Sequence, residues 1–259
     1  MANTNSAGQK GISGYTIKMI AVISMLIDHT AATILEGMLT AGDAAAFPLV
    51  SGHWELFYRI YMIMRGIGRF AFPIYCYLLV EGFYHTRSVP KYALRLFVFA
   101  LISEVPFDLA IRHTLWDMKY NNVFFTLFLG LFVIALMRLV EERLKERFPA
   151  GVRWLLDALI VAAGAFVAEH ILFTDYGAGG VLAIVILYLL YQRRLLGFAL
   201  AVLELVLLSG DLELTALLML FPMACYNGTR GRQMKYFFYA IYPVHLLILA
   251  GICWCLRLN

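Results

Sequence analysis

The residues of this sequence that could do chemistry are charged and titratable side chains inside apolar segments. Asp28 and His29 lie in ISMLIDHTA, eleven residues beyond Lys18, which at about 1.5 Å per residue places them roughly 16 Å along a helix. A charge at the centre of a bilayer costs roughly 2.5–3.5 kcal/mol, so such side chains usually face a polar cavity and pair with one another. An imidazole near carboxylates is a common general base, and His29 is therefore the candidate catalytic base.

Four further charged residues come in pairs that share helix faces. Arg65 and Arg69 are four residues apart, and so are Glu104 and Asp108. Pro106 lies between the two carboxylates and is expected to kink their helix. Each charge then has a candidate partner of opposite sign, either in a reaction centre or in ion pairs that only hold helices together. Buried ion pairs stabilise little relative to apolar packing, so a whole cluster favours a functional site.

The roles within this cluster stay open at the level of sequence. Asp28 points about 100° away from His29 on a helix, so it is one of several candidates to orient the imidazole. The alternative is a carboxylate of the neighbouring helix, Glu104 or Asp108. Arg69 could stabilise the oxyanion of a tetrahedral intermediate, or only neutralise these carboxylates. The candidate catalytic residues are Asp28, His29, Arg69, Glu104 and Asp108.

A second set of polar residues lies at helix ends and in loops. Glu81 and His85 share a face at the end of a helix, and His245 lies beside a proline in YPVHLLIL. We expect these three residues to line the access to a cavity from the cytoplasmic side. The basic residues nearby that could bind the phosphates of a coenzyme are Arg87, Lys91, Arg95, Arg230, Arg232 and Lys235. Basic loops also orient membrane proteins and bind lipid headgroups, so both interpretations stay open.

Motifs for other kinds of chemistry are absent from the sequence. The six histidines show no HExxH or similar spacing, so we expect no metal site. There is no phosphate-binding loop of the Walker type and no glycine fingerprint for a dinucleotide. Nothing in the sequence indicates a nucleic acid as partner.

The elements that position these residues are apolar helices. Of the 259 residues, 62% are hydrophobic and 15% are charged, whereas about a quarter would be charged in a soluble domain. The apolar runs have the length that spans roughly 30 Å of hydrocarbon. We predict an all-α polytopic transmembrane helix bundle, with residues 1–15 as a disordered tail and residues 16–259 as a single transmembrane domain. About nine spans are expected, at residues 17–39, 56–83, 91–111, 122–140, 152–172, 178–191, 195–209, 212–227 and 236–256.

The distribution of basic residues predicts the orientation of the chain. With a cytoplasmic N-terminus, fifteen Lys and Arg residues fall on inner segments and four on outer segments. This is the bias of the positive-inside rule, and an odd number of spans places the C-terminus outside the cytoplasm. Asp108 is only about 6 Å from Arg112 along the helix axis, so the acidic residues lean towards the outer half. We therefore expect an acceptor to arrive from outside.

The chain resembles the TraX family in six segments that are spread over most of its length: KMIAVISMLIDH (18–29), GRFAFPIYCYLLVEGFYHTRSVPKYALRLFVFALISEVPFDLA (68–110), NNVFFTL (121–127), DYGAGGVL (175–182), YNGTRG (226–231) and KYFFYAIYPVHLLIL (235–249). The name-giving members of that family are conjugation-associated membrane proteins that acetylate the N-terminus of pilin. Their architecture is thought akin to transmembrane acyltransferases, in which a histidine of an early helix is central to transfer. The resemblance gives that role to His29. It also implies roles for Asp28, Arg69, Glu81, His85, Glu104 and Asp108.

The resulting hypothesis is a membrane-embedded acyltransferase, an acetyltransferase using cytoplasmic acetyl-CoA, in the inner membrane of a bacterium. The expected partners are membrane lipids, a coenzyme A thioester, and an extracytoplasmic acceptor such as a peptide or protein N-terminus or a glycan. His29 would deprotonate the acceptor's amine or hydroxyl, or form a covalent acyl-imidazole. Intramembrane Asp, Glu and His also form proton relays, so a secondary transporter or proton-coupled channel is the rival function. A non-catalytic scaffold is the third.

Overall fold

Helices make up nearly all of the regular structure of this protein. The computed structural model describes residues 11–41 and 45–258. Within these ranges there is no sheet, only two isolated bridges between Ile12 and Tyr226 and between Asn121 and Thr174. A chain in lipid must satisfy its backbone polar groups internally, which helices do. The prediction of an all-α fold is confirmed.

The helices follow the apolar runs of the sequence, with short irregular turns between them. They are α1 (Gly14–Thr30), α2 (Glu36–Thr40), α3 (Pro48–Gly52), α4 (Trp54–Gly68), α5 (Ala71–His85), α6 (Val89–Phe107), α7 (Val123–Leu144), α8 (Ala150–Phe166), α9 (Gly177–Leu189), α10 (Arg194–Ser209), α11 (Leu220–Cys225) and α12 (Lys235–Leu256). Ala31–Leu35, Asp108–Arg112 and Val167–Ile171 are π-helical turns, and Asp211–Met219 forms a 3₁₀ segment.

The first helix starts near the end of the predicted tail. Residues 1–10 of that tail lie outside the described residues. Ser13 caps α1 by accepting a hydrogen bond from the backbone N–H of Thr16 at 3.4 Å. The π-helical turn Ala31–Leu35 joins α1 to α2 in one run, Gly14–Thr40. Such turns are frequent at functional sites, and this one follows His29 by two residues.

Five helical segments are long and apolar enough to cross a membrane, which makes this an integral membrane protein. They are Gly14–Thr40, Trp54–His85, Val123–Leu144, Ala150–Ile171 and Tyr236–Leu256. The pair α9 and α10, bent by 88°, adds a sixth if it counts as one span. The expectation of nine spans is therefore too high for the described residues.

The expected number of spans exceeds the number of candidate spans in the structure for two reasons. The segments expected at 178–191, 195–209 and 212–227 are helical, but each is short: α9 has 13 residues and α10 has 16. They fold back on one another instead of each reaching the length of a span, about 20 residues. The segment expected at 91–111 forms α6 and the π turn after it. Basic and acidic residues, from Lys91 to Asp108, lie along this segment. It is therefore not among the segments that are apolar enough to cross a membrane.

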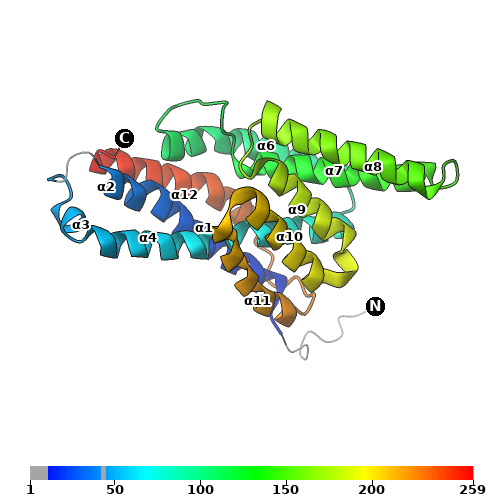
Figure 1. Ribbon diagram of the computed structural model, residues 1–259, viewed down its shortest axis with the longest axis horizontal. Coiled ribbons are helices and arrows are strands. Elements are labelled where there is room, and N and C mark those ends of the chain that lie inside the picture. Colours follow the sequence, from blue (N-terminus) through cyan, green and yellow to red (C-terminus); the bar gives the residue numbers. More distant parts are fainter. Residues whose placement is uncertain (1–10, 42–44, 259) are drawn as a thin grey trace.

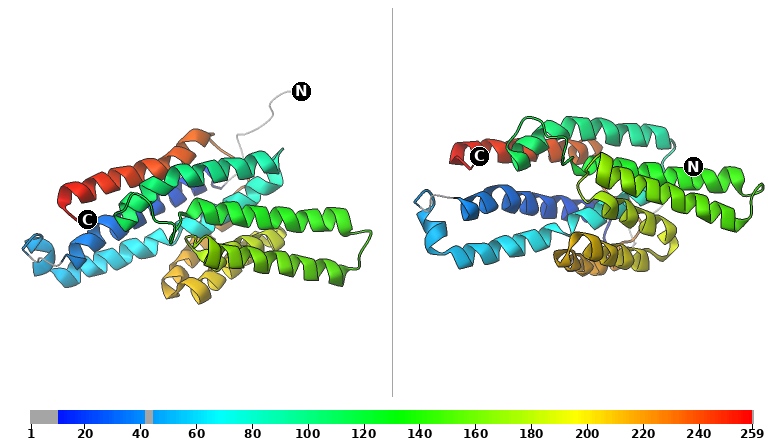
Figure 2. Two further views of the ribbon diagram at one scale, coloured as in Figure 1. Left: turned by 90° about the horizontal axis from the view of Figure 1, so that it is seen from above. Right: turned by 45° about the horizontal axis from the view of Figure 1, so that its top comes forward.

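The helices form layers in which α1 lies between two neighbours. Figure 2 shows α6 and α12 above α1, and α4 on its other side. Figure 1 shows α1, α4 and α12 running side by side towards the end where the C-terminus lies, while α7 and α8 extend together towards the opposite end. Adjacent residues of α1 can therefore face different helices, which decides how the polar side chains are distributed.

The helix α8 lies on the outside of the molecule. None of its residues from Ala150 to Phe166 is buried, and Trp154, Leu155 and Leu159 expose much of their apolar surface. Large exposed apolar surfaces are unusual on soluble proteins. Lipid contact on this helix explains them, in agreement with an integral membrane protein.

Candidate functional site

The carboxylate of Asp28 forms ion pairs with two arginines of the neighbouring helix α4 and the turn after it. Arg65 Nη1 lies 2.7 Å from Asp28 Oδ1, and Arg69 Nη2 lies 2.6 Å from Asp28 Oδ2. The two arginines meet one carboxylate because they share a helix face. Gly68 permits this approach, because a Cβ at that position would overlap Asp28. Each carboxylate oxygen of Asp28 is thus bonded to an arginine, and Asp28 does not orient His29.

A second carboxylate, Glu213, completes this cluster. It lies in the 3₁₀ segment Asp211–Met219 and is 1% exposed. Its Oε1 atom lies 3.3 Å from Arg69 Nη1, and Thr215 of the same segment donates to the carbonyl of Gly66 at 2.7 Å. Two arginines and two carboxylates balance in charge, as a buried ionic group requires. We call Asp28, Arg65, Arg69 and Glu213 the charge cluster.

Glu104 and Asp108 do not take the places expected from the sequence. Asn122 donates to Glu104 Oε2 from its backbone N–H, at 3.2 Å, and also from its side-chain amide. The backbone N–H of Asp117 donates to Asp108 Oδ2 at 2.7 Å. The expected pairing of these carboxylates with Arg69, or with His29, is therefore wrong. Their hydrogen bonds instead hold the loop between α6 and α7 and the first turn of α7.

His29 pairs with a second histidine. Its Nδ1 lies 2.6 Å from Nε2 of His245 in α12, with the two rings parallel within 3°. The carbonyl of Ile241 accepts a hydrogen bond from Nδ1 of His245 at 2.7 Å. A neutral His245 then has its lone pair on Nε2, so His29 donates from Nδ1. This tautomer leaves Nε2 of His29 as the basic nitrogen available to a substrate.

The partner of His29 differs from the one expected. The sequence suggested a carboxylate to orient His29 and placed His245 at the cytoplasmic access, and both expectations are corrected by this pair. His29, Arg69 and His245 lie close to the midpoints of the candidate spans Gly14–Thr40, Trp54–His85 and Tyr236–Leu256. The histidine pair and the charge cluster thus lie at similar depth on different faces of α1.

Members of both groups line one small polar chamber of about 150 Å³. This is several times the volume of a water molecule, enough for a short acyl group and an attacking atom. The charged and basic groups of its lining are Asp28, His29, Arg65, Arg69 and Asp175. The aromatic residues that line it are Phe72, Tyr75, Phe107, Tyr120, Tyr176 and Tyr242.

Two loops close this chamber on one side. The backbone N–H of Asn121 donates to the carbonyl of Phe173 at 2.9 Å, and that of Asp175 donates to the carbonyl of Asn121 at 2.8 Å. The hydroxyl of Tyr120 donates to Asp175 Oδ1 at 2.9 Å. Burial raises the pKa of Asp175, which is outside the candidate spans. We call these joined segments, residues 120–122 and 173–177, the loop clip.

A second cavity, of about 290 Å³, adjoins the chamber. Its polar lining comes from Lys18, Arg232 and Gln233, near the start of α1, and the rest is apolar or aromatic. Met25, Tyr75, Val123 and Tyr242 line both spaces. We call this the basic-end cavity, and these four residues separate it from the chamber that His29 lines.

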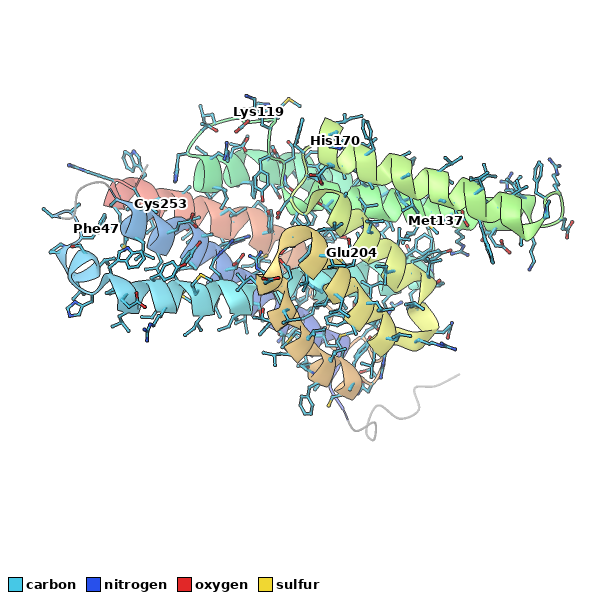
Figure 3. The ribbon with its side chains drawn as sticks, viewed as in Figure 1. Phe47, Lys119, Met137, His170, Glu204 and Cys253 are labelled. Atoms are coloured by element: carbon cyan, nitrogen blue, oxygen red, sulfur yellow. The ribbon has the colours of Figure 1, made fainter. Side chains whose placement is uncertain are left out.

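A third cavity, of about 860 Å³, lies near the other end of α1. Ala32 and Ile111 line both this cavity and the chamber. We call it the C-terminal cavity, because residues 255–258 border it. Phe47, which also lines it, and the buried Cys253 are labelled in Figure 3 at the end of the molecule where the C-terminus lies. The chamber thus lies between two cavities that open towards opposite ends of α1.

Comparison with known proteins identifies the family. The family model described as TraX protein matches residues 13–253. The chain belongs to the TraX family. A curated relative, named probable fimbrial assembly protein FimC, serogroup H1, from Dichelobacter nodosus, is 28% identical over 265 residues, which covers 92% of this chain and 95% of the relative. No solved structure matches the chain.

Most residues expected to bind a coenzyme in this TraX family member lie away from the basic-end cavity. Arg87, Lys91 and Arg230 are exposed, and Arg95 lies over the ring of Tyr92 at 5.4 Å. None of these four lines the cavity, whereas Arg232 does. The side chain of Lys235 is not described.

Glu81 and His85 also lie outside the cavities. The hydroxyl of Tyr226 donates to Glu81 Oε1 at 2.6 Å, which ties α5 to the segment before α12. His85 is exposed, and its Nδ1 bonds the carbonyl of Glu81 within the same helix at 2.8 Å. The expectation that both line the access to the site is therefore corrected.

Sequence reasoning missed two residues that the structure brings to the site. Glu213 is a carboxylate at the start of an apolar segment, and that position alone could have marked it. Tyr242 precedes His245 by three residues and so shares its helix face, and its ring lies 5.8 Å from that of His29. No sequence signal separates Tyr242 from the other aromatic residues of its helix.

The described part of the chain shows no metal-binding site. No group of three or more His, Cys, Asp or Glu residues there could hold a metal ion. The acids and bases at the chamber are the histidine pair, the charge cluster and Asp175.

Proposed function

We propose that this protein is a membrane-embedded acetyltransferase that moves an acetyl group from cytoplasmic acetyl-CoA to an acceptor on the other side of the membrane. The observation that carries the proposal is the free Nε2 of His29 in a polar chamber between two opposed cavities. Membership of the TraX family supports it. The protein would reside in the inner membrane of a bacterium.

The proposed orientation follows the basic residues. The backbone N–H of Gly14 donates to the carbonyl of Thr229 at 2.7 Å, so the start of α1 and the basic segment around Arg230 lie together. With this end in the cytoplasm, the positive-inside rule is satisfied. The basic-end cavity then faces cytoplasmic acetyl-CoA, and the C-terminal cavity faces the acceptor.

In this orientation, Lys18 and Arg232 would bind the phosphates of the donor. The apolar wall of the basic-end cavity would receive the pantetheine arm, and the thioester would reach the chamber past Tyr75 and Tyr242. The chamber is small, which favours an acetyl group over a long acyl chain.

The chemical step would use His29 as general base. Nε2 of His29 removes a proton from the acceptor's nitrogen or oxygen as that atom attacks the thioester carbonyl carbon. The tetrahedral intermediate collapses, the C–S bond breaks, and the proton passes from His29 to the thiolate of coenzyme A. Throughout this step, Nε2 of His245 accepts from Nδ1–H of His29 and stabilises the imidazolium. Attack by His29 itself, through an acyl-imidazole, is the second route.

The acceptor is proposed from the relative. FimC is named a probable fimbrial assembly protein, which points to a subunit of fimbriae and so to the amine of a protein N-terminus. A hydroxyl of a glycan is the alternative acceptor. The volume of the C-terminal cavity, about 860 Å³, is compatible with the end of a polymer.

The same three cavities also favour a second function, because a secondary transporter or channel needs a polar path between opposite faces. One experiment separates the two. Purified protein is incubated with labelled acetyl-CoA and a peptide with a free N-terminus, and the free thiol of coenzyme A and the labelled peptide are measured.

The acetyltransferase proposal predicts release of coenzyme A that His29→Ala abolishes and His85→Ala leaves unchanged. His85 is a matched control, since it is exposed and bound only to its own helix. Absence of turnover and of coenzyme A binding, together with solute flux into liposomes, would overturn the proposal in favour of transport.

A further inference from the structure

A tyrosine of the loop clip has features that the proposed reaction does not yet use. Tyr176 lines the polar chamber directly before α9. Its φ angle is 64°, the left-handed region that a tyrosine rarely adopts. Strained residues of this kind persist where the surroundings hold them, and they cluster at functional sites.

The surroundings of Tyr176 hold it from several sides. Its ring stacks on Phe72 with centroids 3.7 Å apart and planes within 9°. Its carbonyl accepts from the backbone N–H of Gly180 at 2.8 Å, and a Cβ at Gly180 would come within 3.0 Å of both aromatic residues. The backbone N–H of Ala178, in the first turn of α9, donates to Glu169 Oε2 at 2.9 Å. The ring is therefore fixed in one direction.

The hydroxyl of Tyr176 is left for a ligand. It makes no hydrogen bond to any residue in the described ranges, whereas the hydroxyl of Tyr120 is used by Asp175. Arg69 lines the same chamber, so its positive charge acts on the Tyr176 hydroxyl. Burial raises the pKa of Tyr176, so the hydroxyl keeps its proton at neutral pH and remains a donor.

Arg69, the residue first considered for the oxyanion, is held in place by bonds within the protein. Its Nη2 bonds Asp28, its Nη1 bonds Glu213, and its Nε donates to the carbonyl of Arg65 at 3.3 Å. All three nitrogens thus have partners within the protein. A guanidinium carries five N–H groups, so Arg69 keeps two for other partners, but its charge is shared with Asp28 and Glu213. A neutral donor beside it would give an oxyanion a further hydrogen bond.

We propose that Tyr176 is a further catalytic residue, whose hydroxyl donates a hydrogen bond to the thioester carbonyl oxygen as it becomes an oxyanion. This inference rests on the proposed acetyltransferase function. The hydroxyl hydrogen stays on Tyr176 throughout, and the proton of the acceptor passes through His29 as described above. The rigid ring would keep the donor in place before the charge develops, which is the condition for strong stabilisation.

The test removes only the hydroxyl. Tyr176→Phe keeps the ring and its stacking on Phe72, so the fold and its unfolding temperature should be unchanged. Loss of one oxyanion donor typically lowers kcat by about 10²–10³-fold, and we expect a fall of about 10²-fold with KM for acetyl-CoA within about twofold of wild type. Tyr188→Phe is the matched control, because Tyr188 lies in α9 like the backbone next to Tyr176, its ring stacks on that of Tyr84, and it lines none of the cavities described above.

The outcomes separate this inference from the function on which it rests. A wild-type protein without turnover contradicts the proposed function itself. A wild-type protein that turns over, with Tyr176→Phe retaining its kcat, overturns the role of Tyr176. An equal loss of kcat in Tyr188→Phe would likewise overturn it, because Tyr188 lines no cavity and the effect would then not come from the chamber. A raised KM without loss of kcat in Tyr176→Phe would reduce Tyr176 to a binding contact.

Discussion

Nδ1 of His29 and Nε2 of His245 lie 2.6 Å apart, and the second histidine is held in turn by the carbonyl of Ile241. The order of donors runs from His29 to His245 to the backbone, which fixes one tautomer for each ring. In hydrolytic triads, a carboxylate holds the base in this way. Here the neighbouring carboxylate, Asp28, is neutralised by two arginines instead, and a neutral imidazole takes its place.

Loss of this second imidazole should impair the base without removing it. In His245→Ala, His29 loses the group that fixes its tautomer and stabilises its protonated form. We expect kcat for acetyl transfer to fall by about 10²-fold or more, the range of general-base contributions. His245→Asn keeps a side-chain oxygen that can accept from His29 and should retain more activity. Wild-type kcat in His245→Ala would contradict a role for the pair.

The close approach of α1 and α4 gives a prediction about two glycines of one helix turn. A Cβ at Gly68 would overlap Asp28, whereas a Cβ at Gly66 would make an ordinary contact of 3.4 Å with Thr215. Overpacking of this kind typically costs about 1–3 kcal/mol, while Gly→Ala in an unstrained helix gains about 0.5–1 kcal/mol. Gly68→Ala should therefore lower the unfolding temperature in detergent.

Gly66→Ala serves as the matched control for that substitution. It adds the same methyl group two residues away from the crowded position, so it should leave stability unchanged or slightly higher. Equal effects of the two substitutions would show that the contact between Asp28 and α4 does not limit stability.

The ion pairs of Asp28 give a third prediction, measured as the free energy of unfolding. Asp28→Asn leaves Arg65 without its described carboxylate partner and Arg69 with Glu213 alone. Breaking a buried pair by removing one partner typically costs about 3–5 kcal/mol. Glu55→Gln breaks the exposed pair of Glu55 with Arg59, so a cost of about 1 kcal/mol or less is expected. Similar costs for both variants would contradict the assignment of Asp28 to a buried cluster.

The sequence identified the members of the site better than their partners. Asp28, His29 and Arg69 could be found because a charge inside an apolar run has few structural explanations. Their partners depend on which helix lies on each side of α1, and periodicity within one helix does not contain that information. The 100° between Asp28 and His29 raised doubt that they act together, and the structure separates them between α4 and α12.

Two expectations failed because local pattern and length were read alone. Glu104 and Asp108 share a helix face with the right charge, yet backbone N–H groups of the following loop and the Asn122 amide bind them. The number of spans was too high because 13 apolar residues of α9 look like part of a span until its 88° bend to α10 is known. In both cases the outcome depends on how one segment contacts the next or bends against it, and the pattern within a single segment does not contain that information.

The basic-end cavity gives the last prediction, which compares cationic residues that line it with one that does not. Lys18→Ala and Arg232→Ala should raise KM for acetyl-CoA and leave kcat unchanged, because phosphate binding far from the thioester acts on the substrate and the transition state alike. Loss of one such contact is worth about 1.5–3 kcal/mol, or roughly 10-fold or more in KM. Arg87→Ala is the control, since Arg87 is exposed and lies outside the lining. Binding of coenzyme A to each variant, measured by calorimetry, should follow the same order. A larger effect from Arg87→Ala than from Arg232→Ala would place the donor on the exposed loop and not in this cavity.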